Sequence, residues 1–358
     1  MSAFTSLTDF TSLANRCRIL ALMAIAVVAH AVTMEPAPAT IITAEKPFDA
    51  FVEVETTDGV SFILGDPKSS KSVAGTKKPG QYQKVVYLSL TNGDVSFQRA
   101  EVLFATGDFA TASEQYKKAT TTSKWNWEVE QAYRRAATCL ARTGKAADAL
   151  VVLKEYITRY PKNVHMAEVV SLRASLALAA KDYPAAMKDY QEMVTQGTKW
   201  GPTSELDGYL GQNDVLVAQK KFADVVALLN PYWAKLKADA DPEAFGHVAL
   251  AVANALDADG KSAECIAALK KTYLAPIAND AQARARLHHA QLLAKPNDTE
   301  NNLAAFDQVA IAVLLGGDEA TSAAATKLAR ELIMNRIDKD KKLSDDARKE
   351  YRSYLSSL

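Results

Sequence analysis

Residues 107–119 have the sequence GDFATASEQYKKA, and the predicted fold rests mainly on this segment. Its first two residues, Gly and Asp, interrupt an alanine-rich pattern, which is typical of a tight turn between two helices. After the turn, Ala112, Tyr116 and Ala119 recur at helical spacing and therefore lie on one face of the predicted helix. A face on which small residues flank a bulky one is suited to close packing against another helix.

The same arrangement recurs along the chain. Each recurrence has a break in the helical pattern, such as Gly144-Lys145 or Gly260-Lys261, followed by a short apolar residue. The short residues are Ala112, Ala149, Ala186, Val225, Cys265 and Ala305, at successive steps of 37, 37, 39, 40 and 40 residues. An internal period in this range predicts a repeat architecture in which each unit is a helical hairpin.

A second small residue precedes most of these by twelve positions. The pairs are Ala100 with Ala112, Ala137 with Ala149, Ala174 with Ala186 and Ala253 with Cys265, whereas repeat four has Asn213 at this place. Since only small side chains let two helix backbones approach closely, each pair predicts a tight antiparallel crossing. Bulky residues follow four positions later on the same face, at Tyr116, Leu153, Tyr190, Leu229, Leu269 and Val309.

The quoted stretch resembles the turn and second helix of a tetratricopeptide repeat (TPR), with Ala112, Tyr116 and Ala119 on that family's small, aromatic and small positions. Residues 160–163, Tyr-Pro-Lys-Asn, resemble the family's terminal proline. The resemblance covers residues 93–320, although the steps exceed the family's usual thirty-four residues and most repeats lack the proline. It implies an α-solenoid in which stacked hairpins share one core and form a concave inner surface.

The segment 47–92 predicts a small antiparallel β region. Residues 48–55 alternate between apolar and polar, Asp58-Gly59 is a hairpin signal, and residues 60–64 and 84–90 continue the strand pattern. Three strands are therefore expected, packed on the first helices.

Two stretches, one before the β region and one inside it, are expected to be irregular. Residues 32–46 predict a linker, because their prolines favour an extended chain. Residues 68–80 predict a loop too polar to pack, and it carries Lys68, Lys71, Lys77 and Lys78. We expect these lysines to be solvated, the alternative being weak contact with an acidic partner or a lipid surface.

Residues 1–31 have the pattern of a secretory signal peptide. Arg16 and Arg18 precede an apolar run at 19–28, and Ala-His-Ala follows at 29–31. The run is shorter than the about 20 residues that span a bilayer. We expect cleavage after Ala31 and a periplasmic or otherwise extracytoplasmic protein; the alternative is an uncleaved leader that anchors the chain to the membrane.

Residues 321–358 are expected to form capping helices, with Ser344 as an N-cap. The sequence as a whole predicts a mainly α protein, an α-solenoid of TPR-like helix hairpins preceded by a small antiparallel β region.

The composition and motifs limit the chemistry. With 42 basic and 42 acidic residues the formal charge is zero, and we expect no nucleic-acid partner because such proteins carry a basic surplus. Cys139 and Cys265 are expected to be buried without a disulfide. His165 and Glu168 share a helix face, but no second such pair accompanies them. We expect no metal, no cofactor and no enzyme, since no nucleophile motif or nucleotide loop is present.

Partner binding is therefore the expected function. The four tryptophans (Trp125, Trp127, Trp200 and Trp233) are expected mainly to fill gaps between repeats rather than to act as recognition residues. The resemblance places the binding surface on the first helices, where it would include Gln131, Arg134, Glu168, Ser171, His247 and Asn254. A solvated face remains the alternative for this set.

Two functions are open at this point. The first is an exported scaffold or adaptor that binds a protein or peptide on the concave face without catalysis. The second is a structural subunit of a cell-envelope assembly that oligomerises by end-to-end stacking of repeats.

Overall fold

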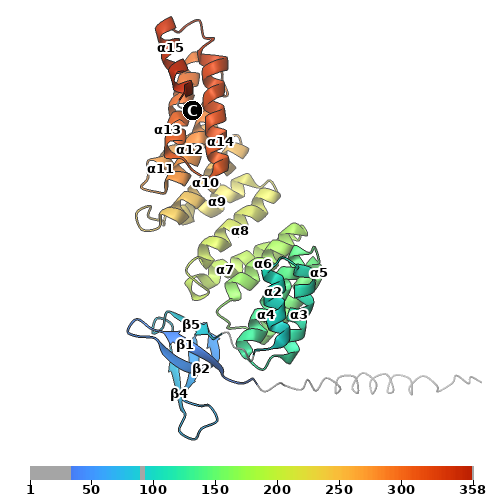
Figure 1. Ribbon diagram of the computed structural model, residues 1–358. Helices are drawn as coiled ribbons and strands as arrows, with labels where there is room; N and C mark the ends of the chain where they lie inside the picture. The colour runs from blue at the N-terminus through green and yellow to red at the C-terminus, as the bar shows by residue number, and fades with distance from the viewer. Residues whose placement is uncertain (1–33, 89–92, 357–358) are drawn as a thin grey trace, which may run out of the picture. The chain divides into compact units, whose positions relative to one another are not determined.

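The structure is a computed structural model that describes residues 34–88 and 93–356 (Figure 1). The chain divides into two compact units, the first ending at Asn163 and the second beginning at Val164. In the described part, an antiparallel sheet and helices make up the first unit, and helices make up the second. The protein is mainly α-helical, as predicted, and the expected signal peptide at 1–31 lies outside the described residues.

The sheet has the strand order β4-β3-β2-β1-β5, and all its neighbours are antiparallel. The strands are β1 (Ala37–Ile42), β2 (Phe48–Thr56), β3 (Gly59–Leu64), β4 (Val73–Lys77) and β5 (Lys84–Tyr87). The predicted alternation places Val52 of β2 and Phe62 of β3 opposite each other in the buried face. Gly59 takes a φ of 137° in the turn between these strands, a value that glycine adopts without strain.

Two strands correct the sequence analysis. The expected linker at 32–46 contains β1, which pairs with β2 on one side and β5 on the other. Its prolines were misleading because the φ that proline imposes suits a strand as well as a linker. The expected loop at 68–80 contains β4, whose polarity reflects its exposed place at the edge of the sheet. The β region therefore has five strands, not three.

The described helices of the first unit form two hairpins. They are α2 (Val95–Ala105) with α3 (Phe109–Thr122), and α4 (Asn126–Arg142) with α5 (Ala146–Arg159). Asp94 and Asp108 begin α2 and α3, where each carboxylate accepts a hydrogen bond from a backbone N–H that has no partner inside its helix.

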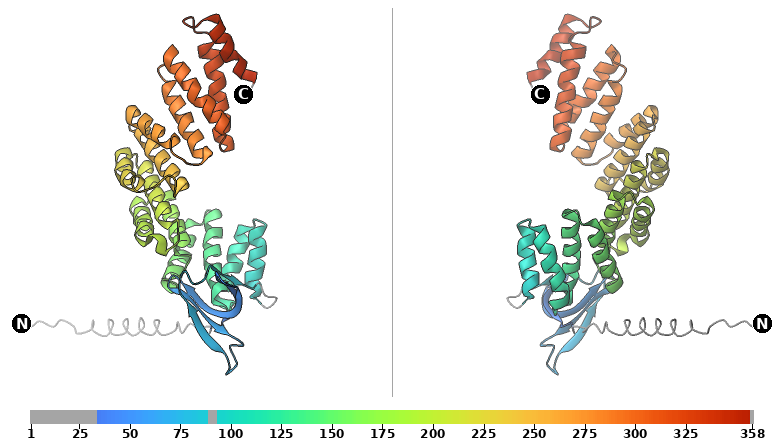
Figure 2. Two further views of the ribbon diagram at one scale, coloured as in Figure 1. Left: turned by 90° about the vertical axis from the view of Figure 1, so that its left-hand side faces the viewer. Right: turned by 90° about the vertical axis from the view of Figure 1, so that its right-hand side faces the viewer.

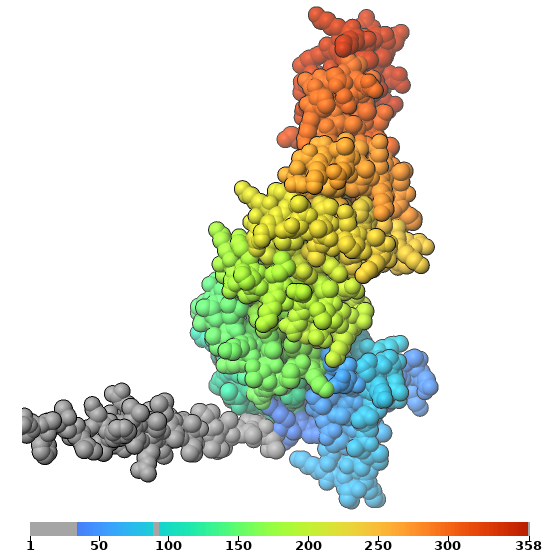
Figure 3. Space-filling model, turned by 180° about the vertical axis from the view of Figure 1, so that it is seen from behind, coloured from blue at the N-terminus to red at the C-terminus, as the bar shows by residue number. Residues whose placement is uncertain are grey.

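The second unit continues the hairpin pattern, and its repeats follow one another in chain order (Figures 2 and 3). Its helices are α6 (Met166–Ala179), α7 (Tyr183–Gln196), α8 (Ser204–Ala218), α9 (Phe222–Trp233), α10 (Pro242–Ala258), α11 (Ser262–Tyr273), α12 (Asn279–Leu293), α13 (Thr299–Leu315) and α14 (Glu319–Glu331). Among the described residues, no helix combines the length and apolar character needed to cross a membrane.

The residues at the predicted helix crossings form the buried core of the repeats. All eight members of the four small-residue pairs are 0% exposed, and the six bulky residues are at most 6% exposed. The Sγ of Cys265 lies 3.2 Å from the carbonyl oxygen of Ala253, so the backbones of α10 and α11 approach as closely as the small residues predict. The predicted burial of both cysteines is confirmed as well.

Repeat four departs from the prediction. Asn213 is only half-buried, and the buried small residues of α8 are Gly208 and Gly211. A Cβ at Gly211 would lie 2.2 Å from the ring of Tyr190, and one at Gly208 would lie 2.8 Å from its carbonyl oxygen. These glycines therefore bring α8 against α7 of the preceding repeat, a contact between repeats that a comparison of positions within hairpins does not reveal.

The turns inside the hairpins share a left-handed residue. Gly107, Gly144 and Gly260 adopt it with φ of 84°, 76° and 76°, while Lys181 and Lys220 adopt it with φ of 61° and 58°. The turn geometry is thus kept in repeats three and four even though the glycine signal is missing from the sequence there.

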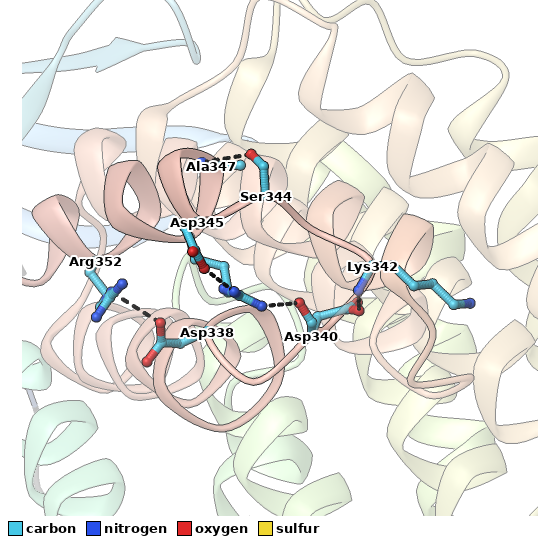
Figure 4. Close-up of polar contacts among 8 residues, drawn as sticks. Asp338, Asp340, Lys342, Ser344, Asp345, Ala347 and Arg352 are labelled. Carbon is cyan, nitrogen blue, oxygen red and sulfur yellow. Dashed lines mark hydrogen bonds and ion pairs between the residues drawn. The ribbon is translucent and has the colours of Figure 1, made fainter.

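The C-terminal cap continues α14 through a π-helical segment, η2 (Leu332–Ile337), into α15 (Asp345–Ser353). Ser344 begins α15 by accepting a hydrogen bond from the backbone N–H of Ala347, as predicted. The loop before it is held by polar contacts, including the ion pair between Arg352 and Asp338 at 3.0 Å (Figure 4). Asp340 also accepts a hydrogen bond from Thr299 at the start of α13, which ties the cap to the last repeat.

Candidate partner-binding site

First helices of repeats four, five and six line a groove in the second unit. Its larger part is a hollow of about 520 Å³ lined by α8, α10 and α12, with Phe222 from α9. A second hollow of about 400 Å³ follows α10 and α12 and shares Leu250, Asn254, Ala258 and Arg284 with the first. We call this surface the α10 groove, defined by Asn213, Asp214, His247, Leu250, Asn254, Arg284, His288 and Gln291.

The amphipathic pattern of α10 explains why it presents this surface. Its buried residues are all apolar, from Ala244 to Leu256. His247, Leu250 and Asn254 follow one another by three and four positions, so they form a single stripe on the opposite side. His247 and Asn254 are exposed, while Leu250 is half-buried between them. The stripe offers a partner polar groups at either end and an aliphatic surface in the middle.

Asp214 is the acidic group on the α8 side of the groove. Its Oδ1 accepts a hydrogen bond from the Asn213 side chain at 3.0 Å, and burial raises the pKa of this carboxyl above its ordinary value. Within residues 34–88 and 93–356, no Lys, Arg or His forms an ion pair with it. A carboxylate in such surroundings favours a cationic ligand.

Other charges of the groove already have partners. Arg284 forms ion pairs with Asp280 at 3.1 Å and with Asp318 at 2.5 Å. The Nε2 of His288 lies 3.0 Å from Asp257, and this hydrogen bond is the main cause of the lowered pKa of the Asp257 carboxyl. These groups shape the wall of the groove and are less available to a ligand than Asp214.

The amide side chains give the groove its hydrogen-bonding capacity. Asn254 and Gln291 form no side-chain hydrogen bond with any residue in the part of the chain that the structure describes. Each amide can donate and accept at once, which matches the alternating N–H and C=O groups of an extended peptide. The groove is thus equipped to hold peptide backbone.

The six residues predicted from the resemblance fall into different settings. His247 and Asn254 line the α10 groove. Glu168 and Ser171 lie on α6, away from the two hollows, and the Glu168 carboxylate is 3.9 Å from His165. Gln131 and Arg134 lie on α4 in the first unit.

The two predicted residues of α4 take part in internal contacts. The Gln131 amide donates to Glu101 of α2 at 3.1 Å, and the Tyr116 hydroxyl donates to the same carboxylate oxygen at 2.6 Å. Arg134 is half-buried, and its charge acts on Glu130 one turn away. An Arg134→Glu exchange would therefore disturb α4 itself and not only a surface.

Glu130 marks a buried polar cluster that the sequence analysis missed. It is 8% exposed, and its two oxygens accept hydrogen bonds from Asn126 and Asn163, both at 2.5 Å. Burial, more than any other cause, raises the pKa of this carboxyl to about 7. In the sequence, Glu130 alternates with apolar neighbours along α4, and this pattern could have indicated that it is buried. Charged residues at such spacing are usually solvated, however, so the pattern is a weak signal.

This cluster lies close to the contacts between the sheet and the helices of the first unit. The Tyr87 ring of β5 stacks on Trp127 of α4 with the ring centroids 5.1 Å apart. Glu35 pairs with Lys124 at 3.1 Å, and the backbone N–H of Thr57 donates to the Lys162 carbonyl at 2.8 Å. Trp127 of α4, together with residues just before α4 and just after α5, thus holds the sheet in place.

Of the tryptophans, Trp233 fills a gap between repeats as expected. It is buried at the end of α9, and its ring packs against Phe245 of the next repeat with the centroids 5.7 Å apart. Trp125 and Trp200 are also buried.

The remaining chemical groups are the metal-ligating and thiol side chains of the described residues. No cluster of three or more His, Cys, Asp or Glu side chains suited to a metal occurs in the described stretches 34–88 and 93–356. Burial raises the pKa of the thiols of Cys139 and Cys265 to about 11, so both stay protonated near neutral pH.

Comparison with known proteins supports the architecture. No protein-family model matches the chain, and no curated protein is similar to it. The C-terminal part of a TPR repeat-containing protein from Cytophaga hutchinsonii matches with a TM-score of 0.51 and 14% sequence identity, over 73% of this chain and 95% of that one. A tetratricopeptide repeat protein from Parabacteroides merdae matches with a TM-score of 0.30 and 15% identity, over 65% and 96% of the two chains. The first similarity shows that this chain has a TPR-like fold.

Proposed function

We propose that this protein is an exported scaffold that binds a protein or peptide segment along the first helices of its repeats, without catalysis. The observation that carries the proposal is the α10 groove, because a predicted first-helix surface coincides there with an open hollow of about 520 Å³. Export rests on the signal-peptide pattern of residues 1–31.

The groove favours a particular kind of segment. Aliphatic lining by Leu210, Val217 and Leu250 suits apolar side chains, and the free amide of Asn254 suits the backbone. Asp214 adds a negative charge that forms no ion pair with any described residue, so a ligand with a lysine or arginine beside apolar residues gains most. We therefore propose an extended segment with a basic residue as the ligand.

Selection from a displayed library of random peptides, with the full chain as bait, tests the proposal. We expect enriched sequences that combine a basic and an apolar residue, and we expect Asn254→Arg to reduce their affinity by at least about tenfold, since it places a long cation across the groove. Asn230→Arg is the matched control, because Asn230 is exposed on the second helix α9.

The outcomes separate the parts of the proposal. Peptides that bind both variants equally well would place the binding surface elsewhere, and a selection without enrichment would remove the peptide-binding function. Peptides that lack basic residues would remove the role of Asp214 alone. N-terminal sequencing of the native protein tests export, with Val32 as the expected first residue.

A further inference from the structure

The β region separates its charges along the sequence. Its acidic residues lie between Glu35 and Asp66, whereas residues 67–93 contain no Asp or Glu. That second stretch carries five lysines: Lys68, Lys71, Lys77, Lys78 and Lys84. The hairpin of β3 and β4 and the connection to β5 are therefore basic, although the whole chain has no net charge.

The lysines are available to a ligand. Four are exposed and Lys77 is half-buried, and none forms an ion pair within residues 34–88 and 93–356. The β3–β4 connection that carries Lys68 and Lys71 is ordered by its own hydrogen bonds. The Lys68 backbone N–H donates to the Asp66 carboxylate at 2.9 Å, and that of Lys71 donates to the Ser69 hydroxyl at 3.1 Å.

An apolar pair lies at the same tip of the hairpin. Leu64 and Val73 are cross-strand partners where β3 and β4 meet the connection. They are 40% and 60% exposed, so the pair stands outside the core of the sheet. The tip therefore combines aliphatic side chains with the ammonium groups of Lys68 and Lys71. Lys77 pairs with Val60 at the other end of β4, and Lys78 follows it.

This tip points away from the part of the sheet that the helices hold. The contacts with the helical part of the first unit involve Glu35, Tyr87 and the turn between β2 and β3, where Thr57 donates to the Lys162 carbonyl and Asp58 forms an ion pair with the Lys162 ammonium. The β3–β4 connection lies at the opposite end of β3 from this turn. β4 is at the other end of the strand order and pairs with β3 alone. In Figure 1 the connection between β3 and β4 projects from the sheet next to the β4 label.

We infer that the β3–β4 hairpin is a contact site for an anionic lipid surface. Lysines bind lipid phosphates as point charges, and the negative potential of an anionic membrane attracts a cluster of them. Leu64 and Val73 can enter the boundary between headgroups and acyl chains. Nucleic acid fits less well, because residues 34–98 contain no arginine and residues 63–81 contain no aromatic side chain that could stack on a base.

Co-sedimentation of the full chain with vesicles tests this inference. One set of vesicles is phosphatidylcholine alone, and the other contains equal parts of phosphatidylcholine and phosphatidylglycerol. Binding to the neutral set reports what the apolar groups contribute, namely the leader, Leu64 and Val73, so the difference between the sets reports the anionic preference. We expect the Lys68→Glu/Lys71→Glu/Lys77→Glu/Lys78→Glu variant to lose that preference by at least about tenfold.

The matched control reverses four exposed lysines on helices, Lys118, Lys154, Lys188 and Lys349, and is expected to keep most of the preference. Leu64→Ser/Val73→Ser is expected to weaken binding to both vesicle sets by a few fold, and circular dichroism shows whether each variant is folded. Raising the ionic strength from about 0.01 M to about 0.15 M, which shortens the Debye length to about 8 Å, is expected to abolish most of the preference without any mutation.

Three results would overturn the inference. They are equal binding to the two vesicle sets by the unmodified chain, equal losses in the hairpin and helix variants, and binding to a single-stranded oligonucleotide or to polyglutamate as tight as binding to the anionic vesicles. The last result would assign the lysines to a polyanion other than a membrane.

Discussion

Helices α4 and α10 occupy the same place in their repeats and have the same length of 17 residues, yet they use their polar side differently. α4 buries Glu128 and Glu130 and directs Gln131 to a carboxylate on α2. α10 buries only apolar and small residues and leaves His247 and Asn254 exposed in the groove. The first helix therefore holds a neighbouring sheet in one unit and remains open to a ligand in the other.

A position within a repeat thus identifies a helix face but not what covers that face. In the first unit, β5 and the connection after α5 supply Tyr87 and Asn163 as partners for Trp127 and Glu130 of α4. In the second unit, no described residue takes that place in front of Asn254. An internal occupant and an external partner require similar side chains, so only the three-dimensional structure distinguishes them.

The largest effect is expected from the pH dependence of the first unit. The pKa of Glu130 is about 7 in the folded chain against an ordinary value of 4.5. Because folding raises this pKa, the stability it contributes is complete below about pH 4.5 and is lost as the pH rises to about 7. The loss amounts to about 3 kcal/mol. This loss of stability is measured by urea-induced unfolding at several pH values in this range, monitored by hydrogen exchange of peptides from α4.

Glu130→Gln is expected to remove most of this pH dependence, since the amide stays uncharged. The control is Glu114→Gln on α3, an exposed position where the dependence should stay as in the unmodified chain. If Glu130→Gln left the profile unchanged, the carboxylate would be ionised in the folded state, and the comparison between α4 and α10 would lose its energetic basis.

The second unit is expected to respond to pH in the opposite direction. Burial, with a smaller effect of Lys270, Arg286 and His288, lowers the pKa of His289 from 6.5 to about 4, and its Nδ1 lies 3.3 Å from the Tyr273 hydroxyl. Folding lowers this pKa, so the stability is present above about pH 6.5 and is lost as the pH falls to about 4. We expect a loss of about 2 kcal/mol, because salt screens the cations that contribute to the shift.

Hydrogen exchange on α12 peptides checks this second profile. His289→Leu should remove the acid-induced loss, whereas His247→Leu should retain it, because His247 is exposed in the groove. Parallel rather than opposite profiles in the two units would show that a process common to the whole chain controls both.

The sequence predicted the repeats well because their signals are local. The small residues and the bulky residues four positions later recur at helical spacing, and each lies where a hairpin must close on itself. The β region was predicted less well. β1 and β4 were missed because one has prolines and the other is a polar edge strand, and only pairing with strands elsewhere in the chain reveals them.

The candidate site was predicted in part for the same reason. His247 and Asn254 followed from their positions on a first helix, whereas Asp214 and Arg284 belong to the groove because α8 and α12 flank α10. That arrangement depends on how adjacent repeats meet. Gly208 and Gly211 control one such contact, and they were overlooked because glycine inside a helix gives no apolar signal.

The smallest effect is expected from truncating one polar side chain on each of the two helices. Gln131→Ala removes the hydrogen bond to Glu101 and is expected to lower the free energy of unfolding by about 1 kcal/mol. Asn254→Ala removes an exposed side chain that has no internal partner among the described residues, and it is expected to change the free energy by less than about 0.5 kcal/mol. Urea denaturation of the full chain measures both. A cost for Asn254→Ala equal to that for Gln131→Ala would mean that Asn254 supports the fold, and the α10 groove would then lose the feature that separates it from α4. If Asn254→Ala changes the free energy of unfolding only slightly and Asn254→Arg abolishes peptide binding, Asn254 serves to bind a partner, whereas Gln131 serves to stabilise the fold.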